Sequence, residues 1–182
     1  MARNIHDFKE KTKGQFARAN LFKVEITPQL EASGKLPSSA NINFLCNAVQ
    51  IPGLSMTTTE RALDYKIRAK QKLYDDITLS FYGSEELPEL DYFNQWLNLM
   101  VNPKTNRVGY YNNYIATVTI KKLSKQGLIE NDIAHETILH DAFPKKIDPI
   151  SLDYGSTDIV KIGVTFGYRY YTFKSIHEHF YL

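Results

Sequence analysis

Apolar and polar residues alternate along several stretches of this chain, and this period-two pattern constrains the fold more than any other feature. Successive side chains of a β-strand point to opposite faces, so alternation over four or more residues predicts a half-buried strand. The pattern predicts strands over residues 21–27, 42–47, 76–82, 114–120, 133–140 and 159–173. The apolar residues expected to face the core are Phe22, Val24, Ile26, Ile77, Leu79, Phe81, Val164, Phe166 and Tyr168.

The segment from Ser55 to Gln71 has few apolar residues that could anchor it to a core. It follows Pro52 and Gly53, a pair that favours a turn, so it is predicted to be a long hairpin or an extended loop. The basic residues that alternate with uncharged ones in this region are Lys66, Arg68, Lys70 and Lys72. We expect a solvated strand face there, because a nucleic-acid binder usually carries a more clustered basic excess.

One helix is predicted over about residues 88–101. Pro88 suits its first turn, acidic residues near that end complement the helix dipole, and Asn102 with Pro103 ends it. The residues at helical spacing that are expected to pack on the sheet are Leu90, Phe93, Leu97, Met100 and Val101, with Trp96 near the edge of this stripe. The fold class predicted from many short strands and one helix is mainly β: an antiparallel sandwich or partial barrel with one flanking helix.

Length and composition set the limits of this fold. With 182 residues, 43% of them hydrophobic, the chain is long enough for one domain with a sizeable core. Its formal net charge is only +2. The single cysteine excludes an internal disulfide framework, and no apolar run reaches the ~20 residues of a membrane-spanning helix. The charged N-terminus lacks the apolar core of a signal peptide, so we expect a chain kept in a reducing, soluble compartment.

The sequence shows no arrangement typical of an enzyme. It has no glycine-rich phosphate loop and no serine in a G-x-S-x-G setting. Cys46 lies in a predicted strand and is expected to be a buried structural thiol. His177 and His179 would face the same way on a strand, but the spacing indicates no third metal ligand, and His135 and His140 would lie on opposite faces. We therefore expect no catalytic residues, no metal and no cofactor.

Long alternating strands leave sheet edges, which are an aggregation hazard in a monomer unless something covers them. Neighbouring subunits can complete the sheet, and closed cyclic symmetry does so without forming open fibres. A ring of strands that closes on itself encloses a lumen, as large barrels do. The pattern therefore favours a ring-shaped homo-oligomer whose sheet continues across subunits.

Six segments occur in a characteristic order along the chain. They are residues 14–26 (GQFARANLFKVEI), 44–53 (FLCNAVQIPG), 75–81 (DDITLSF), 93–96 (FNQW), 143–154 (FPKKIDPISLDY) and 164–170 (VTFGYRY). Taken together, this ordered set resembles the tail tube proteins of T4-like contractile-tailed bacteriophages. The same fold is used by the tubes of type VI secretion and of contractile bacteriocins.

The resemblance implies a structural role in the virion without bond chemistry. Six copies would close into a ring whose inner wall is a continuous β-barrel, and rings would stack into a tube that penetrates the host envelope and conducts DNA. The implied partners are other copies of the chain, the tail sheath protein, a baseplate tube initiator, a tail terminator and the phage DNA, with no stable small-molecule ligand. Assembly would take place in the host cytoplasm and the product would be part of the phage tail.

The chain is expected to divide into an N-terminal arm over residues 1–15, the tube domain over 16–172 and a C-terminal arm over 173–182. In the family, the extended segment after the second strand mediates stacking between rings, and here it maps to about residues 53–71. The interface residues that the resemblance implies are Thr57, Thr58, Thr59, Arg61, Tyr65, Lys66 and Arg68.

Two alternatives stay open at this stage. A tube-like ring protein of the baseplate or tail end shares the fold, and its low copy number in the particle would distinguish it. A stand-alone nucleic-acid-binding β-barrel would instead bind free DNA as a monomer, in a salt-dependent way. Tube lumens in the family tend to be acidic whereas this chain is weakly basic, so Lys66, Arg68 and Lys70 are expected to face outward or to be neutralised by neighbours.

Overall fold

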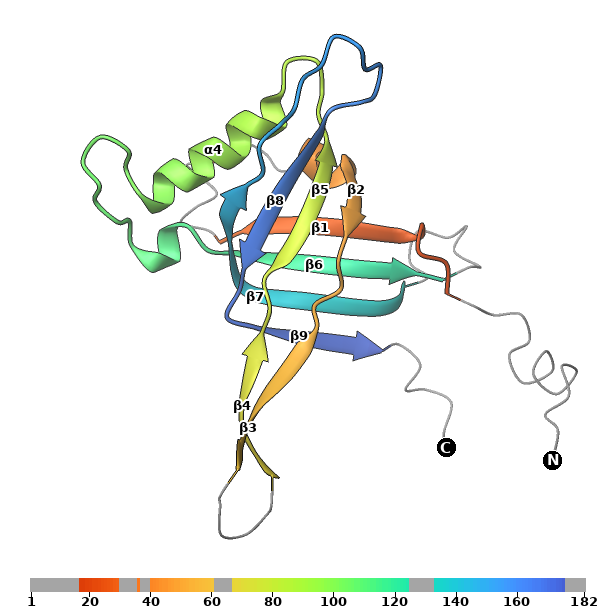
Figure 1. Cartoon of the computed structure of the whole chain (residues 1–182), viewed down its shortest axis with the longest axis vertical. Helices are drawn as coiled ribbons and strands as arrows, with labels where there is room; N and C mark the ends of the chain where they lie inside the picture. The colour runs from red at the N-terminus through yellow and green to blue at the C-terminus, as the bar shows by residue number, and fades with distance from the viewer. Residues whose placement is uncertain (1–16, 30–35, 37–39, 61–66, 125–132, 176–182) are drawn as a thin grey trace, which may run out of the picture.

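The structure, a computed structural model, describes residues 17–29, 36, 40–60, 67–124 and 133–175 (Figure 1). The strands are β1 (Phe22–Pro28), β2 (Cys46–Val49), β3 (Leu54–Glu60), β4 (Ile67–Tyr74), β5 (Ile77–Tyr82), β6 (Ala116–Leu123), β7 (Ile133–Ile147), β8 (Lys161–Gly167) and β9 (Tyr170–Ser175). The helices are α3 (Ala40–Phe44), α4 (Pro88–Met100) and the 3-10 turn η1 (Tyr111–Asn113).

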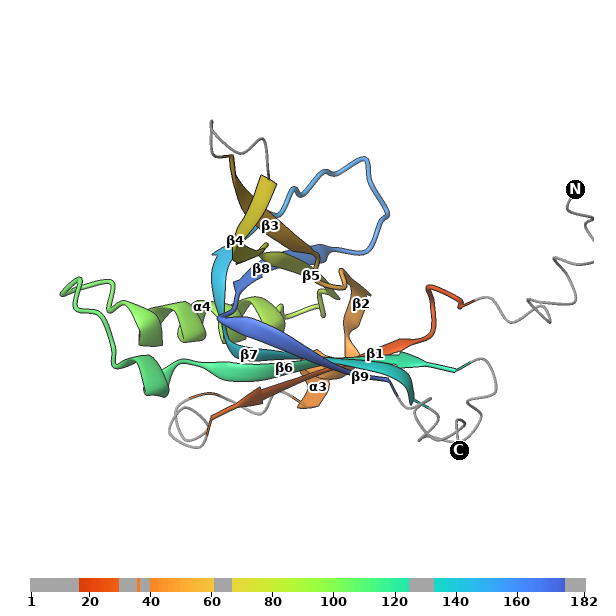
Figure 2. The same ribbon diagram turned by 90° about the horizontal axis from the view of Figure 1, so that it is seen from below.

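The strands form two layers that face each other and share β7 (Figure 2). The first layer has the order β1-β6-β7-β9, and the second has the order β7-β8-β5-β2. Every pair is antiparallel. The N-terminal half of β7 lies in the first layer and its C-terminal half in the second. These antiparallel layers and the main helix α4 confirm the predicted mainly β class.

The backbone of β7 turns from one layer to the other at Asp141. This residue has a φ of 54°, in the left-handed region that aspartate tolerates better than most residues. The register between β6 and β7 shifts at the same place, between Ala116 and Val118. Such a bulge bends a strand and raises its local twist, which is how one strand can serve both layers.

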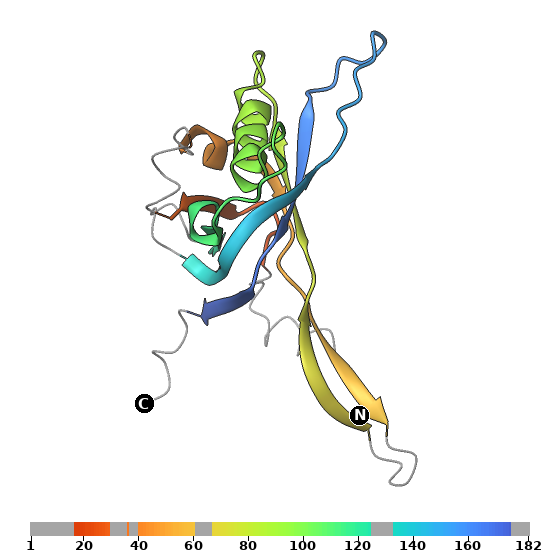
Figure 3. The ribbon, with the colours of Figure 1, turned by 90° about the vertical axis from the view of Figure 1, so that its left-hand side faces the viewer.

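The hydrophobic core lies between the two layers, and α4 covers it from one side (Figures 2 and 3). Seven of the residues expected to face the core are at most 2% exposed: Val24, Ile26, Ile77, Leu79, Phe81, Val164 and Phe166. Phe22 and Tyr168 pack against this cluster from half-buried positions at its margin.

The buried face of α4 is rotated relative to the predicted stripe. Its buried residues are Glu89, Tyr92, Phe93 and Trp96. Leu90 and Leu97 are half-buried, and Val101 is exposed. Trp96 is therefore at the centre of the packing face and not at its edge. The rings of Phe93 and Trp96 both pack against Phe166, with centroids 6.1 and 5.9 Å away, so aromatic packing sets this orientation.

The prediction of one strand over residues 42–47 is wrong. Residues Ala40–Phe44 form the short helix α3, and β2 begins only at Cys46. The helical turn places Ile42 in the core and lets Asn43 Oδ1 accept the backbone N–H of Ile26 at 2.9 Å. A tertiary contact with the edge of β1 thus outweighs the local strand pattern.

The prediction of a single strand over residues 159–173 is also wrong. β8 ends at Gly167, and β9 starts at Tyr170 in the other layer. The strand predicted over residues 133–140 in turn continues to Ile147, through Pro144. Pro144 is buried opposite Phe166, next to a register shift in the β7–β8 pair, where a missing backbone N–H is tolerated.

Candidate assembly surfaces

The β3–β4 hairpin projects beyond the two layers at one end of the molecule (Figures 1 and 3). Leu54, Met56 and Leu73 along it are 46%, 54% and 43% exposed. The register places Met56 opposite Lys72 and Ser55 opposite Leu73, so apolar side chains are exposed on both faces of the hairpin. An isolated two-stranded hairpin is at best marginally stable in water, so contact with a partner would stabilise this one.

Four of the expected interface residues lie on the described part of this hairpin. Thr57 is half-buried and its hydroxyl donates to the carbonyl oxygen of Gln71 at 3.3 Å, beside a bulge in the β3–β4 register. Thr58, Thr59 and Arg68 are exposed. The other three, Arg61, Tyr65 and Lys66, lie outside the described residues.

A cluster of tyrosines anchors the base of the hairpin. The ring of Tyr74 contacts those of Tyr168 and Tyr171, with centroids 6.1 and 5.7 Å away. The Tyr168 hydroxyl donates to the carbonyl oxygen of Asp75 at 2.8 Å, and desolvation raises the pKa of Tyr168 to about 12. The sequence assigned Tyr168 to the core and left Tyr74 without a role, because the cluster joins segments far apart in the chain.

The outer strands of the first layer, β1 and β9, each have one side without a strand partner among the described residues. β1 pairs with β6 alone, and β9 pairs with β7 alone. The helix α3 reaches the C-terminal part of the β1 edge, where Asn43 accepts the Ile26 N–H. Unpaired edges of this kind are templates for pairing with another chain.

The face of the first layer that points away from the core is polar. The register places on it Lys23, Glu25, Thr27, Thr117, Thr119, Lys121, Glu136, Ile138, His140, Tyr170, Thr172 and Lys174. The positive charges of its three lysines are nearly balanced by the negative charges of its two glutamates. Lys121 Nζ lies 2.6 Å from Glu25 Oε2, and Lys23 Nζ lies 3.1 Å from Glu25 Oε1. The Lys121 hydrogen bond is the main cause that lowers the pKa of Glu25.

The cysteine and histidine side chains that were considered as catalytic or metal-binding groups do not lie in an active-site-like environment where the structure describes them. Burial raises the pKa of the Cys46 thiol to about 12, and its Sγ lies 3.5 Å from the carbonyl oxygen of Ala48. The rings of His135 and His140 stack on Phe173 and Tyr170 of β9. No group of three or more potential metal ligands exists among the described residues, which do not include His177 and His179. Within the same ranges, every helix is too short or too polar to cross a membrane.

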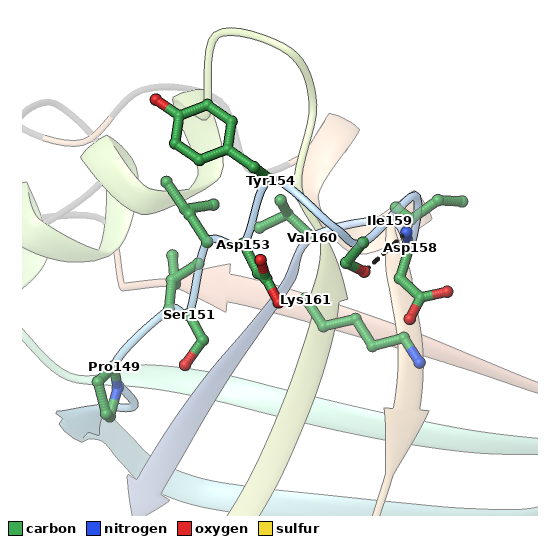
Figure 4. A pocket seen from close by; sticks show the side chains of 11 residues that line it. Pro149, Ser151, Asp153, Tyr154, Asp158, Ile159, Val160 and Lys161 are labelled. Carbon is green, nitrogen blue, oxygen red and sulfur yellow. Dashed lines mark hydrogen bonds between the residues drawn. The ribbon is translucent and has the colours of Figure 1, made fainter.

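The segment between β7 and β8 lies at the end of the molecule opposite the hairpin (Figure 3). A pocket is formed there (Figure 4). Its lining comes from residues within 149–160 of this segment and from Lys161 at the start of β8. Asp153 Oδ1 accepts the backbone N–H of Gly155 at 2.9 Å and so fixes a turn. Leu152, Tyr154 and Ile159 are among the most exposed apolar side chains that the structure describes. The proline and glycine of this segment predict a loop, but no local signal predicts its apolar surface.

The fold resembles that of components of contractile injection systems. The chain is similar, at 14% identity and a TM-score of 0.63, to a protein in the six-fold symmetrised baseplate of the anti-feeding prophage, with 90% of this chain and 99% of that one covered. It is also similar to a chain of the extended PVC sheath–tube complex of an extracellular contractile injection system (16% identity, TM-score 0.60, 92% and 97% covered). A third similar chain is from the PVC sheath/tube terminator (19% identity, TM-score 0.61, 87% of this chain and 96% of that one covered).

No curated protein sequence matches the chain. The phage tail tube protein family does match, over residues 17–174, which include all the strands from β1 to β8 and nearly all of β9. The match agrees with the two-layer fold and with the expected absence of enzymatic activity, because this is a structural family. The chain therefore belongs to the phage tail tube protein family and is a structural component of a phage tail.

Proposed function

We propose that this chain is the subunit of the inner tube of a T4-like contractile phage tail. Six copies close into a ring, and the rings stack into a hollow tube. The tube lies inside the sheath, crosses the host envelope and conducts the phage DNA. It is assembled in the host cytoplasm between a baseplate initiator and a tail terminator.

The observation that carries this proposal is the pair of open edges on the first layer. Its strands alternate in direction in the order β1, β6, β7 and β9, so β1 and β9 run in opposite directions. Related by rotation about a ring axis, β9 of one copy and β1 of the next therefore form an antiparallel pair. Repeating this contact removes every edge of the layer and closes a barrel. The six-fold symmetry is suggested by the similar baseplate of the anti-feeding prophage.

The polar face of the first layer would line the lumen of such a ring. Its charges partly neutralise one another through the Glu25 contacts, and much of the rest is threonine. A surface that binds DNA tightly neutralises many phosphates with Lys and Arg. A nearly balanced wall holds few phosphates, which favours passage of DNA over retention. The same balance argues against the alternative of a stand-alone nucleic-acid-binding barrel.

The β3–β4 hairpin would connect rings. It is long and has apolar side chains on both faces, and the tyrosine cluster at its base holds it away from the layers. The exposed Thr58, Thr59 and Arg68 would contact a neighbouring copy. Arg61, Tyr65 and Lys66, which lie outside the described residues, are proposed to belong to the same interface.

A baseplate or tail-end ring of the same fold is the second candidate. The TM-scores to the baseplate, terminator and sheath–tube chains are 0.63, 0.61 and 0.60, so the fold does not separate these positions. Copy number does. A main tube subunit is among the most abundant proteins of the particle, whereas a baseplate ring contributes a single set of copies.

The test is negative-stain electron microscopy of the purified protein across a concentration series, combined with native mass spectrometry. We expect rings of six times the 21.0-kDa chain mass, and hollow tubes at higher concentration. Rings that never elongate, even with tube seeds from the phage, would favour the baseplate candidate. A monomer at every concentration, with or without seeds, would contradict both.

A further inference from the structure

The two ends of the long axis carry surfaces of a similar kind. At one end is the hairpin with exposed Leu54, Met56 and Leu73. At the other is the β7–β8 loop, residues 149–160 (Figures 1 and 3). In this loop Leu152, Tyr154 and Ile159 are 78%, 109% and 64% exposed. Groups of exposed apolar side chains commonly mark interaction sites.

These two surfaces have opposite charge. Along β4, Lys70 and Lys72 are exposed, and neither pairs with an acidic side chain among the described residues. The charged residues of the β7–β8 loop are Asp153 and Asp158, both exposed, with Lys161 at its border. One carboxylate oxygen of Asp153 holds the turn to Gly155, which leaves the other for a partner.

We propose that the β3–β4 hairpin of one copy docks on the β7–β8 loop of the next copy along the tube. Apolar side chains of the two surfaces cover each other, and Lys70 and Lys72 lie against Asp153 and Asp158. The proposal rests on the tube function above and names the surface that receives the hairpin.

A second copy is the occupant that the geometry favours. The two surfaces lie at opposite ends, so one molecule cannot bring them together (Figure 3). A contact between two different surfaces of identical chains is heterologous and repeats from copy to copy, which is what a tube requires. Tyr154 is fully exposed, and Figure 4 shows its ring directed away from the Asp153 and Lys161 side chains. Opposite charges at the two ends also favour head-to-tail contact over contact between like ends.

A charge exchange tests the pairing. The hairpin variant is Lys70→Glu with Lys72→Glu, and the loop variant is Asp153→Asn with Asp158→Lys, in which Asn retains the oxygen that accepts the Gly155 N–H. Each variant is expected to raise the concentration needed for tubes by about tenfold or more, and combining both is expected to restore most of the loss. The matched control is Lys104→Glu with Arg107→Glu, two exposed basic residues after α4, which should leave assembly unchanged.

The outcomes separate this inference from the tube function. The docking proposal would be overturned if the hairpin variant and the loop variant both assemble like the wild type. It would also be overturned if only the hairpin variant assembles poorly and adding the loop substitutions does not restore assembly. In either case, tubes formed by the wild-type protein still support the tube function. Wild-type protein that never forms rings or tubes would instead contradict the tube function itself. Circular dichroism identifies variants that fail to fold.

Covalent capture gives a second readout that does not depend on a change in affinity. Met56→Cys and Leu152→Cys are combined in a Cys46→Ala background, and assembled tubes are oxidised. We expect the double-cysteine protein to give disulfide-linked multimers on a non-reducing gel. A chain with only one of the two cysteines should give nothing larger than a dimer. A ladder that extends beyond six copies supports the contact along the tube, whereas a ladder that ends at six would place the contact within one ring and overturn docking between rings. Tubes that yield no multimers would overturn the docking.

Discussion

Lys121 Nζ lies 2.6 Å from Glu25 Oε2, diagonally across the β1–β6 pair, on the polar face of the first layer. Lys23 contacts the other oxygen of the same carboxylate. A carboxylate shared by two lysines in this way fixes the charge pattern of the face that would line the lumen, and it makes that pattern sensitive to acid.

The Glu25 contacts predict a pH-dependent contribution to stability. The pKa of Glu25 is lowered from its ordinary 4.5, mainly by the Lys121 hydrogen bond. A carboxyl whose folded pKa is depressed stabilises the fold above the unfolded pKa, and this stabilisation is lost as the pH falls through the folded pKa. Glu25→Gln should therefore destabilise the protein at pH 7, by less than about 1 kcal/mol because the pair is only half-buried, and have little effect in strong acid.

Urea unfolding of wild type and variant at neutral and acidic pH measures this difference. The exposed Glu86→Gln serves as the control, because Glu86 makes no ion pair among the described residues. An equal effect of Glu25→Gln at both pH values would contradict the assignment.

The core contact of Trp96 predicts a larger effect. Its indole N–H donates to the carbonyl oxygen of Tyr114 at 2.6 Å, and the side chain is fully buried. Trp96→Phe removes this donor and leaves unfilled volume, so we expect a loss of about 1–3 kcal/mol in the free energy of unfolding. Denaturant unfolding below the assembly concentration measures it. Tyr110→Phe, at an 84% exposed site, should change stability by no more than about 0.5 kcal/mol.

Cys46 is expected to react slowly with alkylating agents. With a pKa of about 12, its thiolate fraction at pH 8 is ~10⁻⁴, against roughly a fifth for an ordinary cysteine. Iodoacetamide should label the half-buried thiol of the native protein at least about tenfold more slowly than the thiol of the urea-unfolded chain. Mass spectrometry follows the labelling, and equal rates in the two states would show that the thiol is not shielded as the structure has it.

The hairpin can be shortened without removing any of the core residues that the structure describes. Replacing residues 58–70 by Asn-Gly joins Thr57 to Gln71, which are already paired across the strands, through a two-residue turn. We expect the midpoint of thermal unfolding of the isolated subunit to change little, and rings to form without stacking into tubes. Tubes of normal length from this variant would remove the hairpin from the stacking contact.

The tyrosine cluster is expected to control the mobility of the hairpin. Tyr168→Phe keeps the ring contacts with Tyr74 and Tyr171 but removes the hydrogen bond to the Asp75 carbonyl. Amide hydrogen exchange in Leu54–Thr57 and Lys72–Tyr74 should become faster, while exchange in β6 stays unchanged. Tyr170→Phe, whose ring stacks on His140, is the matched control, and equal effects of the two variants would contradict the anchoring role.

The sequence predicted those strands best that keep one face on the core. Val24 and Ile26 in β1, and Ile77, Leu79 and Phe81 in β5, alternate with less buried residues throughout their strands. The pattern could not show where one strand leaves a layer and the next begins in the other, because alternation continues from Phe166 through Tyr168 and Tyr170. The break there depends on the bend of β7 at Asp141, which is distant in the sequence.

The assembly surfaces were only partly predictable. The scarcity of apolar anchors between Ser55 and Gln71 was enough to predict a hairpin or extended loop. The exposure of Leu152, Tyr154 and Ile159 was not predictable, because whether an apolar residue in a loop is covered depends on the tertiary structure. The same holds for Asn43, whose side chain bonds the edge of β1 and so favours a helix where the local pattern predicts a strand.

β7 has a mechanical consequence for a tube built from this subunit. Its fifteen residues belong to both layers, so the two walls of the sandwich are joined by one continuous main chain as well as by side-chain contacts. A force applied to the outer surface, for example by a contracting sheath, would be transmitted to the wall of the channel through the covalent backbone of β7. Sliding one layer past the other would require bending the backbone of β7 at Asp141. A tube of such subunits would therefore resist deformation even if each contact between subunits is weak.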